Sequence, residues 1–187
     1  MKSKRKYQLK SRAAAQERTR RNITEATLEL HAEVGPARTT IAEIAARAGV
    51  SRPTVYNQFP NEFSLFAACS AHFAALHPPP ELGGLPLDQA LGAQYAFYAE
   101  NHRVLANVYR DAETMPALGQ VLHSVQERIS QIVADLARDL GTRGDRRIRA
   151  TAAVALALEF HTWRSLDQSG LAPPAAAALM AQLIRTI

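Results

Sequence analysis

Cysteine is almost absent from this sequence, since Cys69 is the only one among 187 residues. A single thiol cannot form a disulfide within the chain or supply the several thiolates of a structural zinc site. Apolar runs are short, and none approaches the roughly 20 residues that a membrane-spanning helix needs. The N-terminus is basic and contains no apolar segment of the kind found in secretory signals. We therefore expect a cytoplasmic protein that has no membrane partner.

Residues that favour β-sheets are also sparse. Alanine and leucine lead among the apolar residues, which make up 47% of the chain, and this balance favours helices. The sequence lacks a phosphate-binding glycine loop, a nucleophile elbow and a pair of histidines spaced for a metal on one helix. We therefore predict an all-α fold without catalytic residues, a metal site or a cofactor.

Positive charge is concentrated at the N-terminus. Residues 1–21 contain nine Lys and Arg against one Glu, whereas residues 67–187 contain ten basic and eleven acidic side chains. Such a cluster is either a solvated arm or a contact surface for a polyanion, and charge does not distinguish DNA, RNA and acidic lipid. We predict a flexible basic arm over residues 1–13, which either enters a minor groove or only adds nonspecific affinity.

Two helices follow the arm. In the first, apolar residues recur at spacings of three and four until Gly35-Pro36, which can end a helix because glycine adopts a left-handed cap and proline cannot continue it. The second begins at Thr40, which can form a capping box with Glu43, and it ends at Gly49. Both are therefore bounded by local signals.

A third helix begins after Ser51. With Ser51 as N-cap, Arg52 and Pro53 occupy the first two helical positions, where an N–H has no partner within the helix and proline is tolerated. Val55 and Phe59 lie four residues apart and face inward. The second and third helices form a helix-turn-helix, a unit that places its second helix in the DNA major groove.

The rest of the chain predicts a second helical region. Asn61 can cap a fourth helix that runs to about residue 77, and the segment HPPPELGGLP then interrupts the chain. We expect five further helices, at residues 87–101, 102–112, 117–140, 145–168 and 173–187. About nine helices then form a DNA-binding domain over residues 14–66 and a second domain over residues 67–187, connected by the fourth helix.

The segment TTIAEIAARAGVSRPTVYNQFPNEFSLF resembles the DNA-binding domain of the TetR family of transcriptional regulators. The match covers residues 18–66 and rests on Thr39-Thr40, the IA..AGVS core and VYNQF, while the C-terminal region matches in helix count and in its last two helices. Two positions depart from the family. Glu62 stands where members commonly have a phosphate-contacting lysine, and Gln58 stands where they often have histidine or tyrosine.

The resemblance implies a set of DNA contacts. Thr40 and Tyr56 would contact phosphate, Arg52 a guanine edge or a phosphate, and Asn57 a base or a phosphate, while the residues after Arg52 would touch a thymine methyl. The alternatives are pure capping for Thr40, a solvated side chain for Arg52 and a half-buried packing ring for Tyr56. The whole predicted set is Thr39, Thr40, Arg52, Pro53, Thr54, Tyr56, Asn57 and Gln58.

The resemblance also implies a C-terminal domain that binds a small-molecule effector and forms a homodimer. Aromatic and histidine side chains can line a pocket, and an apolar stripe on the last helix can pack against its copy, although either group can also belong to the chain's own core. The candidate ligand residues are Tyr95, Tyr98, His102 and His123, and the candidate dimer residues are Trp163, Leu179 and Leu183.

We therefore expect a ligand-responsive regulator, most simply a repressor that binds a palindromic double-stranded DNA operator as a dimer. The first alternative is a helix-turn-helix protein without a small-molecule effector that is controlled by a protein partner. A helical enzyme and a membrane-surface binder that uses the basic arm are the others.

Overall fold

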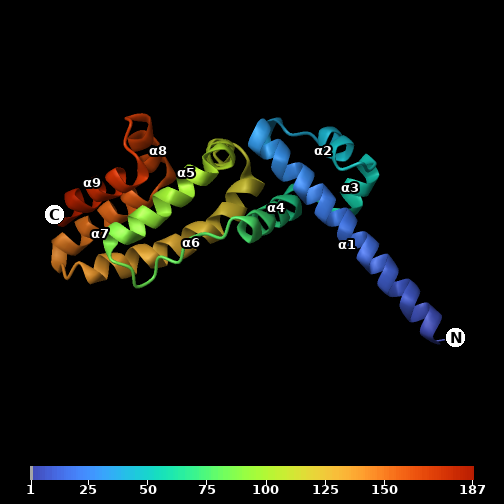
Figure 1. Ribbon diagram of the computed structural model, residues 1–187, viewed down its shortest axis with the longest axis horizontal. Coiled ribbons are helices and arrows are strands. Elements are labelled where there is room, and N and C mark those ends of the chain that lie inside the picture. The colour runs from blue at the N-terminus through green and yellow to red at the C-terminus, as the bar shows by residue number, and fades with distance from the viewer. Residues whose placement is uncertain (1) are drawn as a thin grey trace. The chain divides into compact units, whose positions relative to one another are not determined.

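The computed structural model describes the backbone of residues 2–187 and the side chains from Arg12 onward. Within that range it contains nine α-helices, one short 3-10 helix and no strand, so the predicted all-α class is confirmed. The helices, labelled as in Figure 1, are α1 (Lys2–Glu33), η1 (Pro36–Arg38), α2 (Ile41–Arg47), α3 (Arg52–Gln58), α4 (Glu62–Leu76), α5 (Leu87–Ala112), α6 (Pro116–Asp139), α7 (Gly144–Leu158), α8 (Phe160–Gln168) and α9 (Pro173–Arg185).

The chain forms two compact units. The first unit comprises Met1–His77 with Arg103–Val121, and the second comprises Pro78–His102 with Leu122–Ile187. This division differs from the expected boundary after residue 66. α4 packs on α1, and the end of α5 and the start of α6 return to the first unit, where Phe66 packs with Leu118 and Val121.

Helix α1 begins at Lys2, whereas we expect a flexible arm over residues 1–13. Lys and Arg make up six of these thirteen residues, and both have high helix propensity. A regular apolar period reports which face of a helix is buried, so its absence does not exclude a helix. The side chains of residues 1–11 lie outside the described residues, and contact between the arm and a polyanion stays a prediction.

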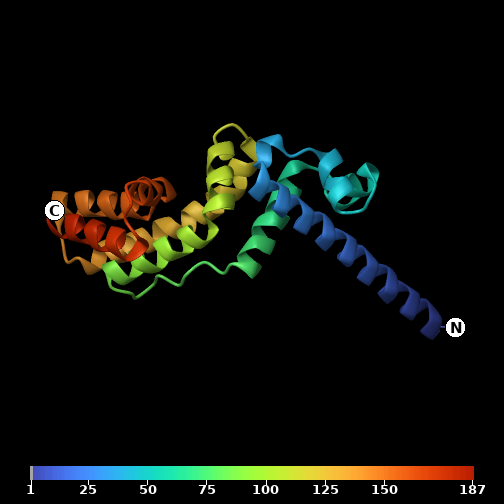
Figure 2. The same ribbon diagram turned by 45° about the horizontal axis from the view of Figure 1, so that its top comes forward.

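Helices α1, α2, α3 and α4 of the first unit lie together (Figures 1 and 2), and an apolar core joins them. Val55 and Phe59 are only 1% and 3% exposed, which confirms that they face inward. Cys69 lies in the same core, where burial raises the pKa of its thiol to about 12. The thiol therefore stays protonated and packs as a small apolar group. The other members are Ile23, Leu30, Ile44, Ala45 and Leu65.

Helix α5 is continuous through Asn101 and His102, where we expect a break. The Asn101 side-chain amide donates a hydrogen bond to the Phe97 carbonyl 2.9 Å away, one turn earlier in the same helix. Its polar group is thus satisfied without ending the helix, and the expected break is wrong.

The expected helix at 145–168 is instead two helices, α7 and α8, which separate at Glu159 (ψ 138°). A break frees carbonyl groups at the end of α7, and two tyrosine hydroxyls from α5 satisfy them. Tyr95 donates to the Ala157 carbonyl at 2.7 Å, and Tyr98 donates to the Leu158 carbonyl at 2.8 Å. These partners are distant in sequence, so no local pattern announces the break.

In the second unit α7, α8 and α9 pack against one another (Figure 1). Several small and aromatic side chains of these helices are almost fully buried, among them Ala157, Trp163, Ala176 and Ala181. No helix in the described part of the chain combines the length and the apolar character that crossing a bilayer requires.

Candidate nucleic-acid interface

The N-terminus of α2 carries the predicted capping box. The Thr40 hydroxyl accepts from the Glu43 backbone N–H at 3.2 Å, and the Glu43 carboxylate accepts from the Thr40 N–H at 2.9 Å and from the Thr40 hydroxyl at 2.7 Å. The hydrogen bonds from the Thr40 hydroxyl and then its N–H lower the pKa of Glu43. A phosphate at this end of α2 would therefore compete with a carboxylate for the Thr40 donors.

Thr39 supports the turn that leads into α2. Its hydroxyl donates to the Gly35 carbonyl at 2.8 Å, and the side chain is half-buried. Gly35 adopts φ +94°, a conformation that favours glycine, and a Cβ there would lie 2.6 Å from a carboxylate oxygen of Asp111. The structure thus gives Thr39 a structural contact, and its DNA contact stays a prediction.

Ser51 caps α3 as expected. Its hydroxyl accepts from the Thr54 N–H at 3.3 Å and lies 2.8 Å from the Thr54 hydroxyl. Arg52 and Pro53 therefore occupy the first turn, and proline loses no helical hydrogen bond there. Thr54 is half-buried, and its hydroxyl is already paired with that of Ser51.

The exposed face of α3 presents Arg52, Pro53, Tyr56 and Asn57. Tyr56 is 57% exposed, which disfavours the alternative of a half-buried packing ring. Within the described part of the chain, the side chains of Arg52, Tyr56 and Asn57 have no hydrogen-bond partner or ion pair, and their polar groups are available to a ligand. Gln58 is half-buried at the end of this face.

Arg20 of α1 contacts the end of α3, and sequence reasoning missed this contact. Its Nη1 donates to the Gln58 backbone carbonyl at 2.6 Å, and its guanidinium lies 4.1 Å from the centre of the Phe59 ring. The partners are 38 residues apart, and Arg20 lies in a run of basic residues that looks uniform in sequence. No local signal could have identified it.

A second arginine joins α2 to α1. Arg47 forms two hydrogen bonds of 2.9 Å with the Glu33 carboxylate and one of 3.3 Å with Glu29. The hydrogen bonds from Arg47 lower the pKa of Glu33. All three side chains are at least 37% exposed, so solvent screens the pairs and each contributes little to stability.

The start of α4 completes the exposed surface. The Asn61 side chain accepts from the Ser64 N–H at 2.8 Å, which confirms the predicted cap. Glu62 is exposed in the first turn, where its charge suits the positive end of the helix but would repel a phosphate. We therefore do not expect the Glu62 side chain to contact phosphate.

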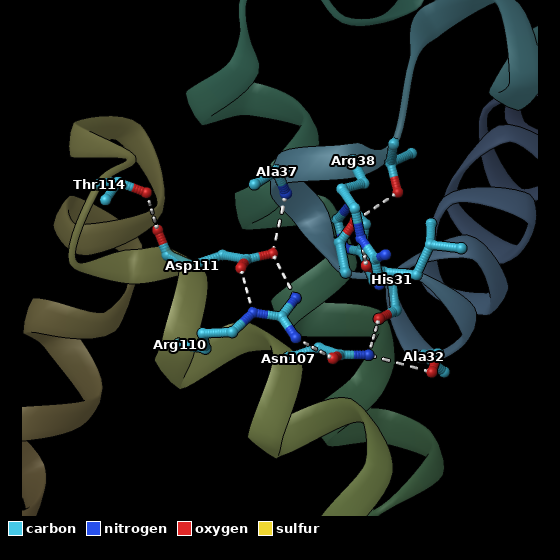
Figure 3. Close-up of polar contacts among 11 residues, drawn as sticks. His31, Ala32, Ala37, Arg38, Asn107, Arg110, Asp111 and Thr114 are labelled. Carbon is cyan, nitrogen blue, oxygen red and sulfur yellow. Dashed lines mark hydrogen bonds and ion pairs between the residues drawn. The ribbon is translucent and has the colours of Figure 1, made fainter.

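The end of α1 and the turn before α2 are joined to α5 by polar contacts (Figure 3). Asn107 donates to the His31 and Ala32 carbonyls at 2.9 and 3.1 Å, and so caps the last turn of α1. Asp111 accepts from the Ala37 N–H at 2.9 Å and from the Arg110 guanidinium at 2.7 Å. These contacts hold the entry to α2 in place.

Two titratable side chains, His31 and Asp111, are buried at this joint, where α5 contacts the end of α1 and the turn before α2. Burial lowers the pKa of His31 to about 4, although the nearby Asp111 carboxylate acts in the opposite direction. Burial alone would raise the pKa of Asp111, but the hydrogen bonds from Arg110 and the Ala37 N–H hold it below its ordinary value. At neutral pH His31 is therefore neutral and Asp111 is charged.

The four candidate ligand residues do not form one cluster. Tyr95 and Tyr98 are buried, and their hydroxyls are bonded to the end of α7. His102 is exposed, with a ring nitrogen 3.0 Å from the Ala99 carbonyl, and the 71%-exposed His123 lies 3.4 Å from the Glu127 carboxylate. Whether any of them contacts a ligand stays a prediction.

The candidate dimer residues divide in the same way. Leu179 and Leu183 are 38% and 52% exposed on α9, whereas Trp163 is 2% exposed. The Trp163 ring packs against Tyr98 and Phe160, at 5.8 and 5.4 Å between ring centres. Its indole N–H is buried and has no acceptor among the described residues.

No group of three or more His, Cys, Asp and Glu residues within the described range is arranged to hold a metal ion. The chemistry that the α2–α3 face offers is hydrogen bonding from Arg, Tyr, Asn and Thr side chains at the ends of two short helices.

Comparisons with known proteins agree with this geometry. Residues 23–69 match the profile of the bacterial regulatory proteins of the tetR family. Over 57 residues the chain is 47% identical to an uncharacterised HTH-type transcriptional regulator from Mycobacterium bovis. That segment is 30% of this chain and only 28% of the length of the relative.

Solved structures match over most of the chain. A TetR-like transcriptional regulator from Rhodococcus sp. RHA1 is 25% identical, with a TM-score of 0.63 over 89% of this chain and 93% of that one. RolR in complex with resorcinol is 19% identical, with a TM-score of 0.55 over 93% of this chain and 89% of that one. The likeness to RolR shows the fold alone.

Proposed function

Because this chain belongs to the TetR family of bacterial regulatory proteins, we propose that it binds a palindromic DNA operator as a homodimer and represses transcription in the cytoplasm. The observation that carries the proposal is the α2–α3 face. The apolar side chains of Val55 and Phe59 face inward. The side chains of Arg52, Tyr56 and Asn57 are exposed and have no partner within the described part of the chain. Such a face suits the major groove.

In this proposal Arg52 reaches a guanine edge or a phosphate, and Asn57 reaches a base or a phosphate. Pro53 and Thr54 contact a thymine methyl group, and Tyr56 bonds a phosphate. Thr39, Thr40 and Gln58 lie at the margins of the same face and hold the protein in register on the DNA backbone.

Dimerisation follows from the need for two half-sites. One short recognition helix makes few base contacts, whereas a two-fold dimer places two of them about 34–36 Å, or a multiple of that distance, apart. Leu179 and Leu183 supply exposed apolar surface on α9 that supports a self-complementary contact. Leu183→Glu should shift the protein from dimer to monomer in sedimentation velocity, and an unchanged dimer would contradict this interface.

Release by a small-molecule effector is the second part of the proposal. The buried N–H of Trp163 supports it, because an unpaired buried donor costs about 1–3 kcal/mol and an effector with an acceptor oxygen could pair with it. Trp163 is the only tryptophan, so its fluorescence reports binding directly. A coupling of about 1–3 kcal/mol between effector and operator would be typical.

The experiment that tests the function is selection of bound duplexes from a random pool at stated salt concentrations. We expect enrichment of an inverted repeat whose affinity falls when either half-site is altered. Enrichment of no palindrome would overturn the operator proposal. If an operator is found but no compound changes both the Trp163 fluorescence and operator binding, control by a protein partner becomes the better account.

A further inference from the structure

The recognition helix α3 is too short to hold its own orientation. It has seven residues, and isolated helices of that length are not stable in water. Ser51 caps its N-terminus and Val55 anchors its middle, but its last carbonyls have no partner within the helix. The C-terminal end also carries the negative pole of the helix dipole, which a cation stabilises.

Arg20 supplies both the hydrogen-bond donor and the positive charge that stabilise the C-terminal end of α3. Its Nη1 donates to the Gln58 carbonyl at 2.6 Å, and its guanidinium lies over the Phe59 ring at 4.1 Å. Arg20 is half-buried, unlike the exposed Arg18 and Arg21 beside it. It therefore connects the long helix α1 to the end of α3 through a charge-assisted hydrogen bond and a stacked ring.

We infer that Arg20 is a positioning residue for DNA recognition, which orients the C-terminal end of α3 rather than contacting DNA. The inference rests on the proposed function of α3 as the recognition helix. Charge alone would place Arg20 among the phosphate contacts of the basic N-terminus. A phosphate contact needs only a cation, whereas this contact uses the planar guanidinium, which lies over the Phe59 ring while one of its N–H groups donates to Gln58. A lysine ammonium is a compact, strongly hydrated charge without this planar fork.

The first test needs no DNA. Hydrogen exchange of the backbone amides at residues 55–59 is compared among the natural protein, Arg20→Ala and Arg20→Lys. We expect exchange in α3 to become about tenfold faster in both variants, with amides in α4 unchanged, since a lost charged hydrogen bond has about that effect. Arg21→Ala is the matched control, because among the side chains that the structure describes Arg21 pairs only with Glu25, at 3.8 Å on the same helix.

Two exchange results would overturn the inference. Unchanged exchange in α3 would mean that Arg20 does not hold the helix. Equal acceleration in α3 and α4 would mean that Arg20 supports the whole unit and has no particular role in orienting α3.

The second test uses the selected operator and full-length protein at several salt concentrations. Positioning predicts about tenfold weaker binding for both Arg20→Ala and Arg20→Lys, with an unchanged slope of log K against log salt. A phosphate contact instead predicts that lysine restores binding and that alanine reduces the slope by about 0.9. That second pattern would overturn the inference.

The two tests separate this inference from the proposed function. If α3 loosens in the DNA-free protein but no palindrome is enriched, the operator proposal fails while the structural role of Arg20 stands. If the natural protein binds an operator and α3 exchange is unaffected by Arg20→Ala, the operator proposal stands and the positioning role fails.

Discussion

The polar side chains of α5 form hydrogen bonds with backbone groups at the ends of other helices, whereas several polar side chains of α3 are exposed to solvent. Tyr95 and Tyr98 donate to the last carbonyls of α7, Asn107 donates to those of α1, and Asp111 accepts from the turn before α2. On α3, by contrast, none of the exposed polar side chains is paired within the described part of the chain.

This difference separates polar side chains whose hydrogen-bonding groups are already paired within the protein from those whose groups are available to a ligand. A buried hydroxyl that satisfies a backbone carbonyl cannot leave it without exposing an unpaired acceptor, which costs about 1–3 kcal/mol. Tyr98 is such a residue, whereas Tyr56 is not. Residue type alone suggested both as binding residues, and they differ in that the Tyr98 hydroxyl already bonds a backbone carbonyl. For both residues, contact with a ligand stays a prediction.

The largest expected effect tests the structural role of α5. The double variant Tyr95→Phe with Tyr98→Phe leaves two carbonyls at the end of α7 unpaired, and should lower the free energy of unfolding by about 2–5 kcal/mol. Urea denaturation measures it. Tyr56→Phe is the matched control, and its stability should stay within about 0.5 kcal/mol of the natural protein because that ring is exposed. Equal stability of all three proteins would contradict the comparison.

A pH titration tests the joint between α1 and α5. The pKa of His31 is about 4 in the folded chain and about 6.5 when unfolded, so below pH 6.5 the unfolded state binds the extra proton. The stabilisation is complete above pH 6.5 and is lost as the pH falls toward 4, by about 3 kcal/mol in total.

His31→Gln should remove this pH dependence between pH 6.5 and 4, as measured by urea unfolding at each pH. Asp111 contributes separately at lower pH, because its depressed pKa means that its stabilisation is lost only as the pH falls through that folded value. An identical pH profile in the variant would show that His31 is not the titrating group.

Arg52→Ala tests the exposed face of α3. Because the side chain has no partner within the described chain, the free energy of unfolding should change by less than about 0.5 kcal/mol. Operator affinity should fall by about 1–3 kcal/mol, with relaxed preference at one base pair if Arg52 reads a base. A uniform loss across sequences would identify a phosphate contact. A stable variant with unchanged binding would remove Arg52 from the interface.

The smallest expected effect concerns the capping box of α2. Thr40→Ala removes the hydroxyl that accepts from the Glu43 N–H, and should cost about 1 kcal/mol in thermal or urea unfolding. Thr40→Ser keeps the cap and should be close to neutral. If Thr40→Ala weakens operator binding beyond its effect on stability while Thr40→Ser does not, the hydroxyl contacts phosphate as well.

Much of the first unit could be predicted from local sequence, because its signals act over three or four residues. Thr40, Ser51 and Asn61 cap helices as expected, and Val55 and Phe59 are buried as their spacing predicts. The same kind of reasoning failed at Asn101 and at Glu159. At Asn101 the side-chain amide is satisfied by a hydrogen bond within α5, so the helix continues. At Glu159 the helix ends, and carbonyls before the break accept hydrogen bonds from hydroxyls of α5, which is distant in sequence.

By itself, then, the sequence determined the helical class, the helix-turn-helix and the order of its exposed and buried positions, since caps, glycine turns and apolar periods are local. Tertiary structure alone decided which polar groups remain available. Arg20 reaches Gln58 across 38 residues, and Tyr95 reaches Ala157 across 62. A hydrogen bond between segments so far apart depends on how helices pack, and no spacing along the chain encodes it.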